Sequence, residues 1–161
     1  MRIFLKVFFL SAITVFFVKD THAQKKTDKK PVTRSQKFIA PKLVTYLATY
    51  KDSVSIPLVI GESIIAAKLT VVDDKNVAYT VSSYQFLYKQ KTVTEDESTG
   101  KVSPSSSIVS DRFTATPLPR LWIDKIKEQL KSGEELYFFD VIAKDTLGRV
   151  MYASSLKILI Q

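Results

Sequence analysis

From residue 43 onward, hydrophobic and polar positions alternate with the period of two that is typical of β-strands. Pieces of this pattern that are rich in Val, Ile, Thr and Tyr predict strands over residues 43–50, 54–60, 64–72, 77–88, 134–143 and 150–160. Pro57 indicates an edge strand for the second piece, because proline cannot donate a ladder hydrogen bond. Polar runs between the pieces predict a turn at 73–76 and a long polar loop at 94–107.

The strand predicted over 77–88 changes phase in its middle. Apolar side chains alternate in one phase over 77–81 and in the opposite phase over 84–88, with the slip at Ser82-Ser83. An extra residue in the strand, a β-bulge, would keep both halves on one core face. Alternatively, the strand passes from one sheet to another and buries a different face at each end.

One segment has a helical period instead. Four apolar residues recur at every fourth position: Leu118, Trp122, Ile126 and Leu130. Prolines are tolerated in the first turn of a helix, and Pro119 stands there, while Gly133 follows as a C-cap. Residues 134–143 are apolar on both faces, which predicts a central strand. We therefore predict a mostly β fold, an antiparallel β-sandwich (Ig-like) with one short helix in a connection.

The start of the chain predicts a secretory signal peptide. Arg2 and Lys6 make a basic beginning, residues 7–18 are apolar or small, and Thr21-His22-Ala23 has the small-x-small form of a cleavage site. The apolar run is shorter than the ~20 residues that span a bilayer, so we expect cleavage rather than a retained anchor. The predicted organisation is a signal peptide at 1–23, a basic flexible leader at 24–42 and one β-sandwich domain at 43–161.

The net charge of +8 belongs to the beginning of the chain, because residues 43–161 carry 14 basic and 14 acidic side chains. Few apolar residues accompany the charges of the leader, which predicts a solvated linker. The alternative is a tether that holds an anionic lipid surface or peptidoglycan through Lys25, Lys26, Lys29 and Lys30. No aromatic residues are interleaved with these lysines to stack on bases, so we expect no nucleic-acid binding.

Few catalytic chemistries are open to this sequence. It has no Cys, and its one His, His22, lies in the predicted signal peptide. Histidine-based and thiol-based catalysis and the usual zinc sites are therefore excluded for the mature chain. Glu95-Asp96-Glu97 lacks the alternating spacing of an EF-hand loop. We predict no catalytic residues, no cofactor and no metal; a carboxylate-based carbohydrate-acting enzyme is the remaining catalytic alternative.

From Val81 to the C-terminus, the order of predicted elements and several local strings resemble the C-terminal domain of the GldM family, which belongs to the gliding-motility and type IX secretion machinery. An aromatic strand at 84–86 leads to an acidic turn at 97–100, and Arg112-Phe113-Thr114 precedes the helix. The most specific string is LKSGEELYFFDVIAKDTLGR at 130–149. The resemblance covers about half of the chain.

The resemblance implies a protein-docking domain that binds an envelope protein in the periplasm. Full-length GldM-like proteins carry a transmembrane helix and further domains ahead of this one. This sequence instead shows a signal peptide, a leader and one domain, so we expect a stand-alone exported domain. A docking partner would add a strand to the last predicted strand, 150–160, with Tyr152, Leu156 and Ile158 as candidate interaction residues. Trp122 is a fourth candidate, because an exposed Trp is a typical binding hot spot.

Overall fold

The computed structural model describes residues 37–161, and the compact unit within them comprises Phe38–Gln161. The predicted signal peptide, and the part of the predicted leader before Lys37 with its four tether lysines, lie outside the described residues. The described part of the chain forms the following strands and helices in order: β1 (Val44–Leu47), β2 (Tyr50–Lys51), β3 (Ser53–Ile56), α1 (Leu58–Ile64), β4 (Leu69–Val72), β5 (Ala78–Glu95), β6 (Val102–Phe113), α2 (Arg120–Gln129), β7 (Glu135–Lys144), β8 (Val150–Tyr152) and β9 (Leu156–Ile160).

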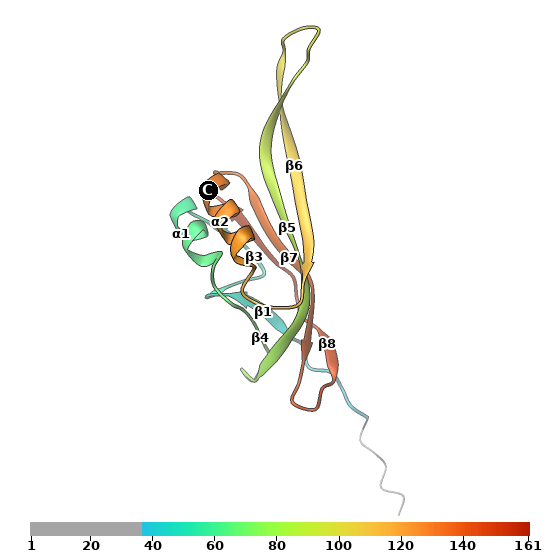
Figure 1. Cartoon of the computed structure of the whole chain (residues 1–161). Helices are drawn as coiled ribbons and strands as arrows, with labels where there is room; N and C mark the ends of the chain where they lie inside the picture. Colours follow the sequence, from blue (N-terminus) through green and yellow to red (C-terminus); the bar gives the residue numbers. More distant parts are fainter. Residues whose placement is uncertain (1–36) are drawn as a thin grey trace, which may run out of the picture. The chain divides into compact units, whose positions relative to one another are not determined.

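The strands form one mixed sheet in the order β2-β1-β4-β5-β7-β9-β3, with β6 also paired to β5 and β8 to β7 (Figure 1). The two ends of this order are consecutive in the chain, so the sheet nearly closes into a barrel. Leu43 bridges to Ala153 across the remaining seam, where the Ser154 N–H also donates to the Leu43 carbonyl. The predicted mostly β class is confirmed, although β3 and β9 run parallel rather than antiparallel.

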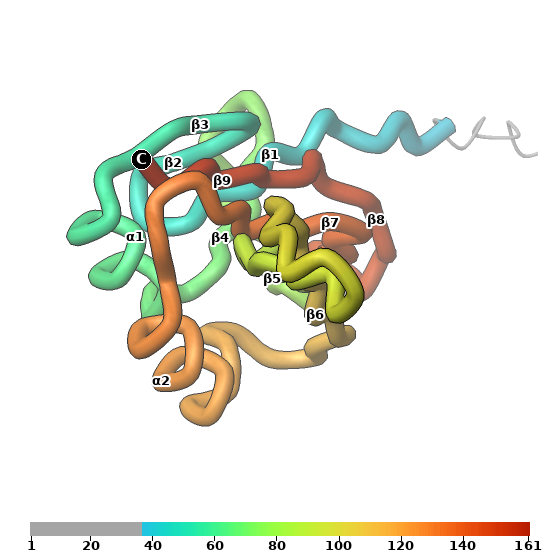
Figure 2. The backbone as a smooth tube through the Cα atoms, turned by 90° about the horizontal axis from the view of Figure 1, so that it is seen from above, coloured from blue at the N-terminus to red at the C-terminus, as the bar shows by residue number. Residues whose placement is uncertain are grey.

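The core lies between the central strands and the two helices, which lie near each other in the view from above (Figure 2). Tyr84, Phe86 and Phe138 are fully buried on β5 and β7. Gly61 of α1 approaches β9 so closely that a Cβ there would lie 2.7 Å from Ile160. A side chain at this position would therefore require the ends of the Ile160 and Leu130 side chains to move.

The helix α1 corrects the prediction of strands over 54–60 and from 64 onward. Pro57 stands at the N-cap of α1 and ends β3, which is the last strand in the sheet order, as an edge strand would be. Gly61, Ile64 and Ile65 are buried at helical spacing, whereas Val59 is 71 % exposed. The run of β-branched residues favoured a strand, but proline is readily accepted where a helix begins and the buried face has the helical period.

The phase slip in β5 is confirmed as a bulge, because the pairing with β7 shifts register between Val81 and Gln85. A second slip explains why β7 is apolar on both faces. Asp140 has a positive φ of 46° there, and the buried positions change from 136 and 138 to 141 and 143. The prediction that β7 is central is also confirmed, since it pairs with β5 on one side and with β8 and β9 on the other.

Residues 94–107 form the outer end of a long β-hairpin, not a loop. The β5–β6 hairpin extends beyond the rest of the sheet (Figure 1), and its turn is confined to the residues between Asp96 and Lys101. The Asp96 carboxylate accepts from the hydroxyl and N–H of Ser98 and from the N–H of Thr99, which lowers its pKa. Both faces of this part of the hairpin are exposed, so its sequence lacks the alternation that marks a half-buried strand.

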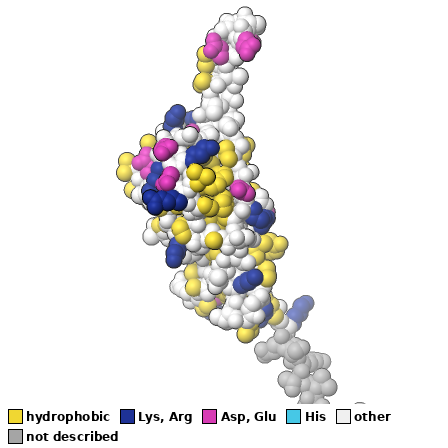
Figure 3. Space-filling view, in the orientation of Figure 1, with side chains coloured by type: hydrophobic (Ala, Val, Ile, Leu, Met, Phe, Trp, Pro, Cys, Tyr) yellow, Lys and Arg dark blue, Asp and Glu magenta, His cyan; other side chains and the backbone are white. Residues whose placement is uncertain are grey.

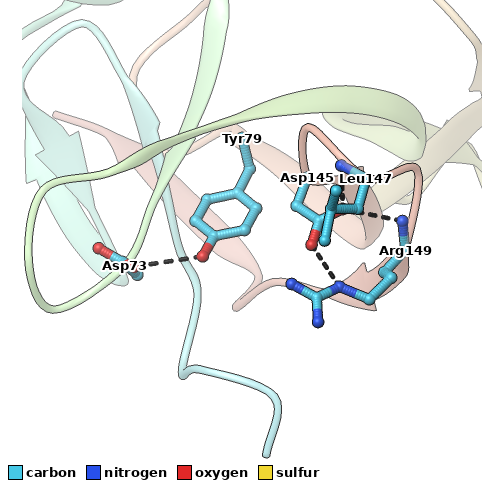
Figure 4. A network of polar contacts seen from close by, with 5 residues as sticks. All are labelled: Asp73, Tyr79, Asp145, Leu147 and Arg149. Atoms are coloured by element: carbon cyan, nitrogen blue, oxygen red, sulfur yellow. Dashed lines mark hydrogen bonds and ion pairs between the residues drawn. The ribbon is translucent and has the colours of Figure 1, made fainter. Parts of the chain in front are cut away.

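Two aspartates stabilise the tight turns at the other end of the sheet (Figure 4). The Val77 N–H, together with the Lys75 N–H and the Tyr79 hydroxyl, donates to Asp73 and lowers its pKa. This turn confirms the one predicted at 73–76.

The second aspartate is Asp145, in the β7–β8 turn. Burial acts to raise its pKa, but hydrogen bonds from Arg149 and from the Leu147 N–H outweigh burial and lower it. The Arg149 guanidinium lies 2.6 Å from Asp145 and also stacks over the Phe38 ring at 3.7 Å. Phe38 is thereby attached to the domain ahead of the predicted boundary at residue 43.

Candidate protein-binding surface

A groove of about 210 Å³ lies between α2 and β6. Its lining is mostly apolar and consists of Tyr88, Val109, Leu121, Trp122, Lys125 and Ile126. Figure 3 shows hydrophobic side chains gathered on the face of the molecule that carries α2, with Lys or Arg side chains beside them. Exposed apolar surface bounded by polar residues is characteristic of protein-interaction sites. We refer to this feature as the α2–β6 groove.

The predicted apolar stripe attaches α2 to the sheet. Ile126 is fully buried, and Trp122 packs edge-on against Phe86 and Phe113, with ring centroids 5.8 and 5.5 Å away and interplanar angles of 84° and 85°. Edge-to-face geometry is favourable for aromatic pairs and fixes the rotation of the helix about its axis. As a result Leu121, one position off the stripe, projects outward and is 79 % exposed.

The charges beside the groove come from α2. Arg120 forms an ion pair with Asp124 at 3.6 Å, one helical turn further along. Lys125 lines the groove and forms no ion pair with any residue of 37–161. The groove therefore offers an apolar binding surface with one positive charge at its side.

A buried carboxylate supports the floor of the groove. Glu134 is 2 % exposed and accepts hydrogen bonds from the Tyr88 hydroxyl, the Lys91 N–H and the Lys131 N–H. Burial, together with the adjacent Glu134, raises the pKa of Tyr88. These bonds connect β5, the segment after α2 and the start of β7. Gly133, just before Glu134, has a positive φ of 84°, a conformation that favours glycine.

Of the four predicted interaction residues, only Trp122 lines the groove. Tyr152 is 73 % exposed, but it lies on β8, which pairs with β7 and not with β6. Leu156 and Ile158 are fully buried, and β9 is paired with β7 on one side and with β3 on the other. The prediction of a docking edge is therefore wrong for β9, which carries Leu156 and Ile158, whereas β8 pairs with β7 alone among the named strands. The apolar alternation of 150–160 reflects the core, and its second neighbour comes from a segment about 100 residues earlier in the chain.

Five of the six residues that line the groove were not among the predicted interaction residues, and Leu121 and Val109 show why. Leu121 is a large apolar residue outside the helical stripe, and this mismatch was a usable signal of an exposed contact. Val109 was overlooked because the segment ahead of it reads as a polar loop, whereas it lies in β6 opposite Tyr88.

Within residues 37–161, no group of three or more His, Cys, Asp or Glu side chains is placed to hold a metal ion. No helix in this part of the chain is long and apolar enough to cross a membrane. No protein-family model matches the sequence, and no curated protein is significantly similar to it. The resemblance of residues 84–149 to the GldM C-terminal domain thus stays a prediction.

Proposed function

We propose that this chain is an exported, non-enzymatic protein-binding domain of the bacterial envelope, which holds a partner protein in the α2–β6 groove. The observation that carries the proposal is Leu121, a leucine exposed at the mouth of an apolar groove. Burying such a side chain at an interface favours binding by about 1.5–3 kcal/mol. The adjacent Trp122 is of the residue type most enriched at binding hot spots.

The partner that fits this groove is a protein segment with an apolar side chain next to a carboxylate. The apolar side chain would fill the space between Val109 and Leu121, and the carboxylate would pair with Lys125. Such a charge would mainly improve association rate and specificity, because Lys125 lies at the rim. A partner in a gliding-motility or type IX secretion complex rests on the resemblance at 84–149 and is part of this proposal.

Export is the first testable element. The protein expressed with its full N-terminus in a Gram-negative host should be recovered from the periplasm with Gln24 as its first residue. N-terminal sequencing of the purified protein measures this. A membrane-bound product that retains Lys19 would contradict both the cleavage site and the periplasmic location.

Substitution at the groove tests the binding function. Leu121→Glu should reduce capture of the partner from the envelope fraction at least tenfold, because a charge replaces the apolar contact. Leu147→Glu is the matched control, since Leu147 is 75 % exposed but lies in the β7–β8 turn. The captured protein is identified by mass spectrometry, and its affinity for each purified variant is then measured by calorimetry.

The two remaining functions give different results in the same experiment. If the chain is a tether acting through its leader, removal of residues 24–36 abolishes capture and Leu121→Glu does not. Equal capture by Leu121→Glu and Leu147→Glu, with both variants folded, would show that the groove does not bind the partner. Hydrolysis of an envelope glycan by the purified domain would replace the binding function with the carboxylate-based enzyme.

A further inference from the structure

The strand β6 has one unpaired edge in the described part of the chain, because it pairs only with β5. The Asp96 N–H bonds the Lys101 carbonyl at the closed end of the hairpin, so residue 101 faces β5. Residues of an antiparallel strand alternate in the direction of their backbone polar groups. In β6 the even-numbered residues therefore direct their N–H and C=O groups away from β5, toward the open edge.

Two independent features limit this edge. Pro104 has no N–H. It is an even-numbered residue, so the N–H that it lacks would have pointed to the open edge and not to β5. At the other end the Arg112 N–H is bonded to the Asp111 carboxylate at 2.7 Å and is not available to another strand. Ser106, Ile108 and Ser110 lie between these two positions with their outward N–H and C=O groups open. We call residues 106–110 the window of β6, and Ile108 lies at its centre.

We propose that β6 pairs antiparallel with β6 of a second copy of this chain, about a two-fold axis at Ile108. In this register Ile108 lies opposite Ile108 of the other copy, and Ser106 lies opposite Ser110. Pro104 then lies opposite Arg112, so the two positions that cannot donate face each other. A partner strand with an N–H at both facing positions would receive no N–H from β6 in return. A second copy of β6 has no available N–H at either position, so the loss is shared between the same two pairs. The ladder contains about six backbone hydrogen bonds.

The side chains of the window are compatible with this pairing. Residues 105–110 carry no charge, so no like charges are brought together. Ile108 is 59 % exposed on the face opposite α2, where the pairing would bury it against its own copy. A point-group dimer of this kind uses the same surface patch on both subunits. The inference does not depend on the α2–β6 groove binding an envelope protein.

The first test is the oligomeric state of the full mature chain, measured by sedimentation equilibrium over a hundredfold range of concentration. The wild-type protein should show a reversible monomer–dimer equilibrium. Ser106→Pro should weaken dimerisation at least tenfold without unfolding the hairpin, because the Ser106 N–H is not bonded to β5. Val102→Pro is the matched control: residue 102 also faces outward but lies beyond Pro104, so its dimer should persist.

The second test uses the absence of Cys from the sequence. In the proposed dimer the two Ile108 Cα atoms are about 5.5 Å apart, which is within the range that a disulfide spans. Ile108→Cys should therefore form a covalent dimer at least tenfold faster than Val102→Cys at the same concentration. A wild-type protein that is monomeric throughout, with equal oxidation rates for the two Cys variants, would overturn the proposal. Loss of envelope-protein capture by Ser106→Pro in a monomeric wild type would assign the edge to that protein instead.

Discussion

Replacing Glu134 with alanine should lower the free energy of unfolding by about 3–5 kcal/mol. The Glu134 carboxylate is the shared acceptor for one buried hydroxyl, that of Tyr88, and for the N–H groups of Lys91 and Lys131. The substitution leaves these three donors without their shared acceptor at a buried or partly buried site, and each unsatisfied donor costs about 1–3 kcal/mol. The expected value is below their sum because the segment after α2 can move to expose its N–H groups.

Urea denaturation of the Glu134→Ala variant measures this effect. Glu134→Gln is the control, because its amide oxygen still accepts one of the hydrogen bonds and its cost should be about half as large. Tyr88→Phe removes the hydroxyl that Glu134→Ala leaves without an acceptor. Adding it to Glu134→Ala should therefore lower the free energy of unfolding only a little further. A Glu134→Ala cost below about 1 kcal/mol would show that water reaches the donors and that the carboxylate does not organise this end of the sheet.

Trp122→Ala should lower the free energy of unfolding by about 3 kcal/mol, the lower end of the range for buried aromatic residues. The lower end applies because Trp122 is partly buried and one side of it lines the α2–β6 groove. The loss includes the edge-to-face contacts with Phe86 and Phe113. Partner capture should also decrease, since these contacts set the rotation that exposes Leu121.

Thermal and urea unfolding of Trp122→Ala and Trp122→Phe measure the two parts of this effect. Phenylalanine retains an aromatic edge and should recover about half of the lost stability. A cost below about 1 kcal/mol for Trp122→Ala would indicate that α2 is held by Ile126 and Leu130 alone. If capture also fell sharply in that case, the role of Trp122 would be binding rather than packing.

The bulge and the helical stripe show what local pattern could predict. The change of phase at Ser82-Ser83 predicted either an extra residue in β5 or a strand that passes between two sheets, since side chains alternate strictly along a strand. The recurrence of apolar residues from Leu118 to Leu130 predicted a helix, and α2 contains Trp122 and Ile126 of this stripe, with Leu118 and Leu130 just outside its ends. Both features depend on neighbours within a few positions, and the structure confirms both.

The groove was only partly predictable. Trp122 was a candidate from its residue type, but the choice between core and surface needed the positions of Phe86 and Phe113, which belong to other strands. The β6 strand was missed because both faces of the outer hairpin meet solvent and carry Ser and Thr. Backbone hydrogen bonds hold β6 to β5, and the pattern of hydrophobic side chains contains no signal of these bonds.

Composition and local periodicity were sufficient for the β class, the helix α2, the aspartate turn at 73–76 and the exclusion of thiol chemistry. They were not sufficient for which strands are edges. Leu156 and Ile158 alternate with polar residues as in an edge strand. β9 is nevertheless enclosed, because β3, about 100 residues earlier in the chain, pairs with it in parallel. Residues 58–64 favour a strand by their β-branched side chains, yet packing against Ile160 and Leu130 makes them a helix. Both outcomes depend on contacts between segments about 70–100 residues apart, and a local pattern holds no information about the partner that a segment will meet.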